Sequence, residues 1–138
     1  MSGYLFAFLT VLFWGITPAL EKGALRQTDP LIAMAVRNFS ISCILLLLLT
    51  GSGNLSKLKE LDAKTTLLIA AGGFLAALAG QWTYFKALQK IDVSRLTPIV
   101  GSYPLVTLLV ATLVLGEKFT LTKLVGTLLI VVGIALVK

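Results

Sequence analysis

The sequence predicts an all-α membrane protein, a bundle of five transmembrane helices in a single domain over residues 1–138. Apolar residues make up 57% of the chain and charged residues only 13%, whereas an ordinary soluble domain has roughly 45–50% and about 25%. Five apolar segments are long enough to cross a hydrocarbon core of about 30 Å, which takes about 17–25 helical residues. They are continuously apolar, unlike barrel strands of about 10 alternating residues. Helices then satisfy the backbone polar groups in lipid.

The first three helices are expected at residues 4–20, 31–50 and 65–85. Asp29-Pro30 starts the second, because Asp caps a helix N-terminus and Pro suits the first helical position. The chain-bending stretch 51–54 ends it. Before the third helix, leucines recur every three residues among charged ones, which predicts a short amphipathic segment at the membrane interface. These leucines are Leu55, Leu58 and Leu61.

The fourth and fifth helices are expected at residues 93–115 and 121–137, with Lys138 as a terminal anchor. Their connection, Gly116-Glu117-Lys118, is short, so the two helices should form an antiparallel hairpin. The first apolar segment has no basic residue before it and no clear small-residue cleavage site, so it is interpreted as a retained helix.

An odd number of helices places the two chain ends on opposite sides of the membrane. The positive-inside rule then compares the lysines and arginines of the two sides. They are Lys57, Lys59, Lys64, Lys118 and Lys123 on the side of the N-terminus, against Lys22, Arg26, Lys86, Lys90, Arg95 and Lys138 on the other. This near balance leaves two alternatives: the chain inserts in both orientations, or one dominant loop fixes a single orientation.

Enzyme chemistry has no visible basis in the sequence. The chain has no histidine and one cysteine, Cys43, so we expect neither a histidine metal site nor histidine catalysis. It has no glycine-rich phosphate loop, and its basic residues are typical of headgroup anchors, not of a nucleic-acid surface. We therefore expect no catalytic residue, metal, cofactor or nucleic-acid partner. The carboxylates are expected at helix ends or in loops: Glu21, Asp29, Glu60, Asp62, Asp92 and Glu117.

Arg37 is the charged residue that lies furthest inside an apolar segment. An arginine at the bilayer centre costs about 2.5–3.5 kcal/mol on insertion scales. Arg37 either faces an aqueous cavity and attracts an anionic substrate group, or it extends to the headgroups or pairs with a carboxylate such as Glu21. In the first case, Arg37→Ala impairs transport and leaves insertion intact.

Aromatic residues mark the first and third helices. In the first, Pro18 leaves the carbonyl of Trp14 without its helical partner and should kink the helix. In the third, Gln81 and Trp82 follow a run of small residues that favours close helix packing. Each aromatic residue lines a substrate route or belongs to the interfacial belt, and for Gln81 and Trp82 the two alternatives are equally open.

Two prolines interrupt the fourth helix. Thr97-Pro98 and Ser102-Tyr103-Pro104 should break it twice, and broken helices recur at transporter binding sites. We take Pro18, Pro98 and Pro104 as helix-kink positions.

Gly126 and Gly133 lie seven residues apart on the fifth helix, close to two turns, so both share one face. A glycine face lets another helix approach closely. It serves either dimerisation or internal packing, and dimerisation is favoured because the last helix of the hairpin should be peripheral.

Short motifs follow one another along the whole chain. They are Phe13-Trp14-Gly15, Arg37, the stretch 84–88, Arg95-Leu96-Thr97-Pro98, Leu115-Gly116-Glu117 and the glycine-spaced stretch 126–133. Together they resemble the EamA-type repeat of the drug/metabolite transporter superfamily, and the chain is similar to its single-repeat, five-helix bacterial and archaeal members. The resemblance implies a multi-pass protein of a prokaryotic plasma or inner membrane.

The resemblance also implies a working arrangement. Most members carry two repeats with opposite orientations, so a single repeat would pair with an inverted copy of itself as an antiparallel homodimer surrounded by lipid. This dimer would move a small-molecule substrate by alternating access, and the expected lining residues are Trp14, Arg37, Gln81, Trp82, Ser102 and Tyr103. The similar four-helix small multidrug resistance proteins carry a glutamate in the first helix, and this sequence has none near the corresponding Trp14. The alternatives are a non-transporting subunit of a heteromeric complex and a flippase of a lipid-linked substrate.

Overall fold

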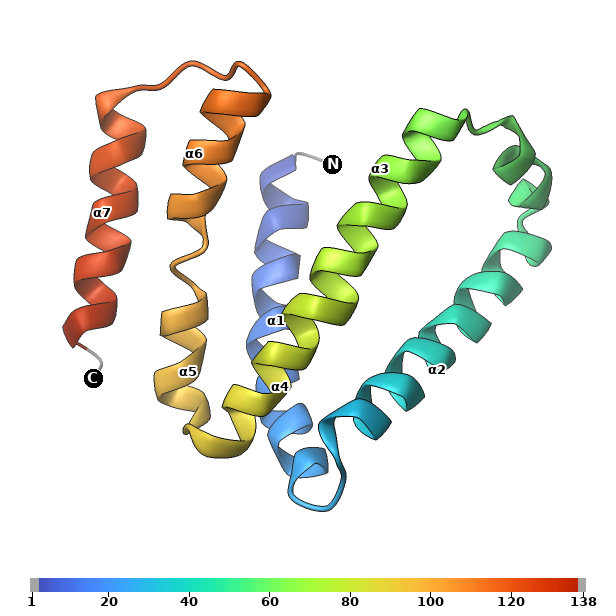
Figure 1. The fold of residues 1–138 in the computed structure, drawn as a ribbon, viewed down its shortest axis with the longest axis horizontal. Coiled ribbons are helices and arrows are strands. Elements are labelled where there is room, and N and C mark those ends of the chain that lie inside the picture. Colours follow the sequence, from blue (N-terminus) through green and yellow to red (C-terminus); the bar gives the residue numbers. More distant parts are fainter. Residues whose placement is uncertain (1–2, 137–138) are drawn as a thin grey trace. The chain divides into compact units, whose positions relative to one another are not determined.

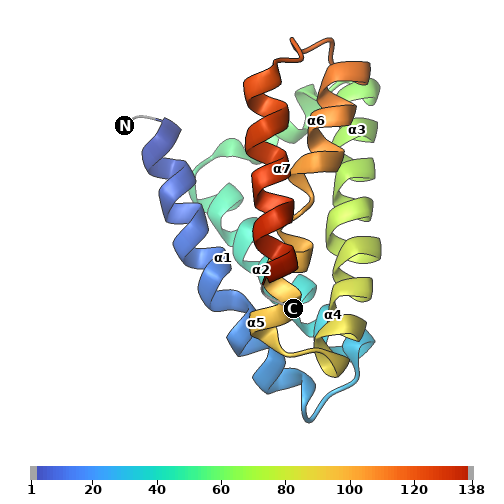
Figure 2. The same ribbon diagram turned by 90° about the vertical axis from the view of Figure 1, so that its left-hand side faces the viewer.

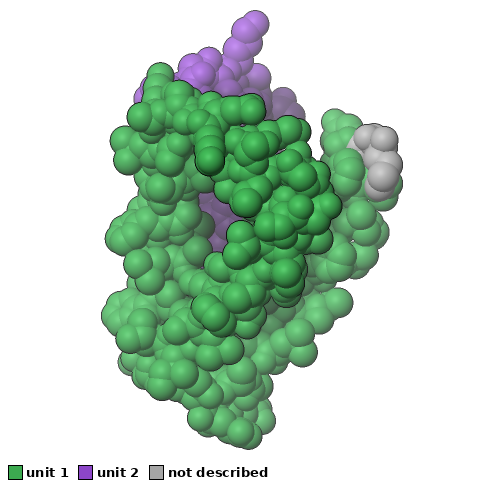
Figure 3. All heavy atoms as spheres, turned by 90° about the vertical axis from the view of Figure 1, so that its right-hand side faces the viewer, with its two compact units in different colours: residues 1–90 green, residues 91–138 purple. Residues whose placement is uncertain are grey.

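The fold was analysed in a computed structural model, which describes residues 3–136. Four helices are long and apolar enough to cross a membrane, over Gly3–Leu25, Pro30–Gly51, Ala63–Lys90 and Val93–Val114, and a shorter apolar helix follows at Leu121–Leu136. The described residues include no strand, and the predicted all-α membrane fold is confirmed. Val137 and Lys138, the expected end and anchor of the last helix, lie outside the described residues. The chain forms two compact units, residues 1–90 and 91–138, coloured separately in Figure 3.

The first unit contains three long helical segments (Figure 1). They are α1 (Gly3–Leu25), α2 (Pro30–Gly51) and a third made of α3 (Ala63–Gly73), the π-helix η2 (Phe74–Gly80) and α4 (Gln81–Lys90). The amphipathic segment predicted between the second and third helices is the 3₁₀-helix η1 (Asn54–Glu60).

Two helices run further than their apolar stretches predicted. The first was expected to end at residue 20 and the third at residue 85, but they end at Leu25 and Lys90. The added residues include glutamate, lysine, glutamine, alanine and leucine, which are strong helix formers once a helix is nucleated. Glu21 was expected at a helix end or in a loop. It lies instead within α1, four residues before its end.

Aspartates cap the helices that follow loops. The predicted start at Asp29-Pro30 is confirmed, since an Asp29 carboxylate oxygen accepts the Leu31 N–H at 2.8 Å and Pro30 is the first residue of α2. Asp62 caps α3 by accepting the Thr65 N–H at 3.3 Å. The hydrogen bonds from the Thr65 hydroxyl and backbone lower the pKa of the exposed Asp62 carboxyl.

Thr65→Val should raise the pKa of Asp62 toward its ordinary value, because it removes the hydroxyl donor and keeps the backbone donor. Because the pKa is lower in the folded state, this cap stabilises the protein at pH values above the unfolded-state pKa. The contribution disappears as the pH falls through the folded-state pKa. An NMR titration of the Asp62 carboxyl carbon measures the shift. Thr66→Val is the matched control, because the Thr66 hydroxyl bonds the Asp62 backbone carbonyl.

The apolar core of the first unit lies at one end of its helices. Leu25, Met34, Phe85 and Leu88 are at most 5% exposed. Pro30, the first residue of α2, is also buried. Figures 1 and 2 show α1, α2 and α4 converging at this end, while their continuations diverge toward the other.

Two side chains connect the ends of α1 and α4. Lys22 of α1 donates to the carbonyl of Leu88, and Gln89 of α4 donates to the carbonyl of Leu25 at 3.4 Å. Each helix therefore satisfies a C-terminal carbonyl of the other, a group that a helix end leaves without an internal partner.

The second unit contains α5 (Val93–Val100), α6 (Pro104–Val114) and α7 (Leu121–Leu136). Two breaks were predicted between residues 93 and 115, but only one is present, at residues 101–103. Pro98 remains inside α5. The turn forms because Ser102 and Tyr103 bond three residues back, to the carbonyls of Ile99 and Val100, after which Pro104, which has no N–H, starts α6.

Gly116 ends the hairpin's first helix in the left-handed conformation, with φ of 68°. Glycine adopts this conformation without steric cost. The connection between α6 and α7 then runs over residues 115–120.

Candidate functional site

A polar cluster joins the three helices of the first unit. The Glu21 carboxylate on α1 receives two contacts through its Oε1 atom: Arg37 Nε of α2 lies 3.8 Å away, and Gln81 Nε2 of α4 donates to it at 3.2 Å. The structure thus brings the predicted site residues Arg37 and Gln81 together on one carboxylate.

Asn38, the residue after Arg37 on α2, contacts the third helical segment. Its Nδ2 donates to the main-chain carbonyl of Ala77 at 3.5 Å. Consecutive side chains of α2 therefore reach α1 and the third helical segment. We call Glu21, Arg37, Asn38, Gln81 and the Ala77 carbonyl the polar layer.

The polar layer lies directly next to the apolar core along each helix. Glu21 precedes the buried Leu25 by four residues, Gln81 precedes the buried Phe85 by four, and Arg37 follows the buried Met34 by three. Residues three and four apart share a helix face. The faces that pack the core therefore continue as the faces that carry the polar groups.

The ion pair reduces the charge that these helices place in the membrane. Arg37 lies seven residues inside α2, about 10 Å from its start, and Glu21 about 6 Å from the end of α1. The Glu21 side chain is 12% exposed and the Arg37 side chain 38%. The alternative in which Arg37 pairs with Glu21 is confirmed, and contact with an anionic substrate group stays a prediction.

The guanidinium retains hydrogen-bonding capacity. Arginine carries five N–H donors in a planar fork, and Glu21 is the only ion-pair partner of Arg37 within residues 3–136, with Nε lying 3.8 Å from its Oε1. The Nη side of Arg37 can therefore donate to a ligand while Nε stays beside Glu21.

Sequence reasoning named Glu21 as a candidate partner of Arg37 but did not place it among the lining residues, because the first apolar stretch ends at Leu20. One spacing could have identified it. Glu21 follows Trp14 by seven residues, close to two helical turns, so the two share a face of α1 about 10 Å apart.

Of the other four predicted lining residues, two belong to the first unit and two to the second. Trp14 is 65% exposed on α1 and Trp82 44% exposed on α4, where the Lys86 ammonium lies 5.7 Å from a Trp82 ring centroid. Ser102 donates its hydroxyl to the Ile99 carbonyl at 2.7 Å within the turn of the second unit. Tyr103, the next residue, is 55% exposed.

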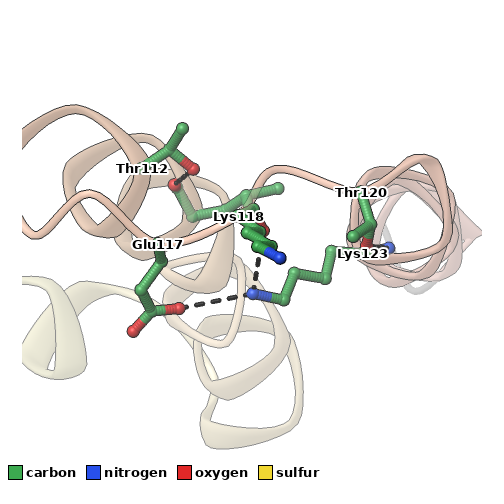
Figure 4. A network of polar contacts seen from close by, with 6 residues as sticks. Thr112, Glu117, Lys118, Thr120 and Lys123 are labelled. Carbon is green, nitrogen blue, oxygen red and sulfur yellow. Dashed lines mark hydrogen bonds and ion pairs between the residues drawn. The ribbon is translucent and has the colours of Figure 1, made fainter.

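An open groove of about 510 Å³ lies along α6 and α7 in the second unit. Its lining includes Tyr103, Thr107, Gly126 and Thr127. Near the hairpin loop, Lys123 Nζ lies 3.3 Å from a Glu117 carboxylate oxygen and donates to the Lys118 carbonyl at 3.2 Å (Figure 4).

The two glycines predicted at a dimer interface are both open. A Cβ added at Gly126 or Gly133 would meet no atom within 4 Å. Packing among the described residues therefore does not require a glycine at either of these two positions.

Comparisons with known proteins agree with this architecture. The sequence profile of the EamA-like transporter family matches residues 1–138. A Sinorhizobium sp protein described as "Uncharacterized transporter in cobO 3'region" is 28% identical over 132 residues, covering 96% of this chain and 93% of the relative. An "Uncharacterized transporter" of Archaeoglobus fulgidus is 26% identical over 77 residues, covering 56% of this chain but 28% of the relative. No solved structure matches the chain.

Proposed function

Because the chain belongs to the EamA-like transporter family, a family of the drug/metabolite transporter type, we propose that it is a secondary transporter of a small metabolite or drug-like solute. Transport would proceed by alternating access, in which two repeats rock around a site near the membrane midplane. The chain is a multi-pass membrane protein, and its two prokaryotic relatives support a place in a bacterial or archaeal plasma membrane.

The polar layer is the observation that carries this proposal. Ionisable residues within membrane helices are rare, face the bundle interior or a water-filled cavity, and mark substrate pathways. Here an arginine, a glutamate and a glutamine from three separate helices meet in a chain whose surface is otherwise strongly apolar. A purely structural bundle of this composition would not require such a group.

The proposed ligand contacts are centred on Arg37 and Gln81. Trp14 would extend the site along the shared face of α1, and Trp82 would contribute from α4. In the second unit, Ser102 and Tyr103 lie at the interrupted helix, the kind of backbone irregularity that recurs at transporter sites.

A second copy of the chain is the proposed partner. One repeat supplies half of a two-repeat transporter, and an inverted copy would supply the other half as an antiparallel homodimer. The open face of Gly126 and Gly133 supports close approach of a partner helix at α7.

Reconstituted liposomes test the function directly. Purified protein is first screened by thermal shift against amino acids, sugar phosphates, nucleotide sugars and cationic drugs, since a ligand at 100 times its Kd stabilises by about 2.7 kcal/mol. Uptake of each stabilising compound is then measured. The absence of uptake of any of them by correctly inserted protein would overturn the proposal.

In the same assay, we expect Arg37→Ala to reduce uptake by about 10- to 100-fold, the range for one lost hydrogen bond to a charged group. Arg26→Ala is the control, because Arg26 is an exposed arginine in the loop after α1. Equal uptake by both variants would remove Arg37 from the site.

A further inference from the structure

The third helical segment changes its winding beside the polar layer. Its residues Phe74–Gly80 form a π-helix between two α-helical stretches. The Gln81 N–H, for example, bonds the Ala76 carbonyl five residues back. A π-helical turn holds more residues than an α-helical turn, and such turns concentrate at functional sites.

Gly80 is the residue that permits this winding. A Cβ built on Gly80 would lie 2.9 Å from the main-chain oxygen of Leu75, five residues earlier. That distance is too short for a real Cβ, and the obstructing atom belongs to the backbone. Gly72 and Gly73, just before the turn, would each accept a Cβ with nothing within 4 Å.

Side chains satisfy carbonyls of this irregular turn. Asn38 donates to the Ala77 carbonyl at 3.5 Å, and the Thr83 hydroxyl lies 3.0 Å from the Ala79 carbonyl and 2.9 Å from that of Gly80. Non-regular backbone at membrane depth is tolerated where neighbouring side chains re-satisfy it. The Asn38 contact is the one that comes from another helix.

We infer that Gly80 and Asn38 are positioning residues of the polar layer: Gly80 permits the π-helical turn, and the turn places the Ala77 carbonyl opposite Asn38, next to Arg37. Asn38 is thereby held with its amide in the layer. The importance of this placement for ligand binding rests on the proposed function, whereas the placement itself does not.

The packing decides what moves if the turn tightens into an α-helix. One residue would leave the turn, and the stretches on its two sides would rotate relative to each other by about 100°. Phe85 and Leu88 anchor α4 in the core, whereas the residues of α3 are almost all exposed. The rotation therefore falls on α3 and the turn, so the Asn38–Ala77 contact breaks and the Gln81–Glu21 contact persists.

Side-chain amide NMR of the full-length protein in lipid nanodiscs tests this inference. In Gly80→Ala, we expect the Asn38 amide signals to shift to those of an amide without its carbonyl partner, while the Gln81 amide signals stay in place. Gly73→Ala is the matched control and should shift neither. An unchanged Asn38 signal in Gly80→Ala would overturn the inference, as would an equal shift of Gln81.

Asn38→Leu provides a second route if Gly80→Ala does not fold. It removes the donor and leaves the turn-forming glycine, so the Ala77 carbonyl carbon should shift while those of Gly72 and Gly73 do not. An unmoved Ala77 signal would contradict the contact. Once a transported solute is known, both variants should raise its KM about fivefold, the effect of one neutral hydrogen bond. If the variants show these NMR shifts but the wild-type protein transports no solute, the proposed function alone is contradicted.

Discussion

Glu21→Gln should destabilise the protein by up to about 2.5–3.5 kcal/mol, because it leaves Arg37 charged and without its carboxylate inside a membrane helix. Arg37 is 38% exposed, and its access to water or headgroups lowers the effect toward the bottom of that range. Gln81 keeps an amide partner at position 21 in this variant, so the loss isolates the charge and not the hydrogen bond.

A double-mutant cycle separates the pair from its members. The variants are Glu21→Gln, Arg37→Gln and the double variant, and their unfolding free energies are measured in bicelles with denaturant. Each single variant leaves one charge unpaired, and the double variant leaves none. We expect a coupling energy of about 1–3 kcal/mol, with the double variant more stable than either single variant.

The Glu117–Lys123 pair of the hairpin is the matched control. Its N–O distance is 3.3 Å, shorter than the 3.8 Å of the Glu21–Arg37 pair, but its side chains are 55% and 46% exposed. Exposed pairs contribute about 0–1 kcal/mol. A Glu21–Arg37 coupling no larger than that of this control would show that the polar layer is solvated and would remove its energetic role.

A reporter fused to the C-terminus should be active on both sides of the membrane. The sequence places five basic residues on one side and six on the other, and the lysine and arginine bias sets orientation. Two reporters, one active only in the cytoplasm and one only outside it, measure the fractions. Activity from both supports dual insertion and the antiparallel homodimer, whereas a single active reporter contradicts that dimer.

Changing the balance should then move the orientation in a chosen direction. Lys90→Ala with Arg95→Ala removes two charges from the side of the C-terminus and leaves four basic residues there against five, so the share of copies with the C-terminus outside should rise. Lys57→Ala with Lys59→Ala removes two charges from the opposite side and should give the reverse. All four residues are exposed, so the paired variants control each other for changes in folding. Unaltered fractions in both would show that a single dominant loop fixes the orientation.

The helical membrane fold could be predicted from the sequence because bilayer insertion depends on composition along one segment at a time. The continuous apolar stretches have no other stable state in lipid than helices. Asp29-Pro30 is likewise a local signal, since the capping carboxylate and the helix that it starts are neighbours in the chain. Arg37 was identifiable as a site candidate because a charge within an apolar stretch needs a partner or a cavity.

The partners of these residues were decided by the tertiary structure. Gln81 is 60 residues from the carboxylate that it contacts, and the packing of Leu25, Met34, Phe85 and Leu88 brings α1, α2 and α4 together there. Glu21 looked like a helix-end or loop residue because a hydropathy pattern places the end of a helix where the apolar residues stop. The helix itself continues as long as its backbone hydrogen bonds continue, which is to Leu25. The π-helical turn at Gly80 has the same origin, whereas the break at residues 101–103 was indicated locally by Ser102-Tyr103-Pro104. Backbone winding depends on which atoms approach from other turns and helices, and no local pattern of residues specifies those distances.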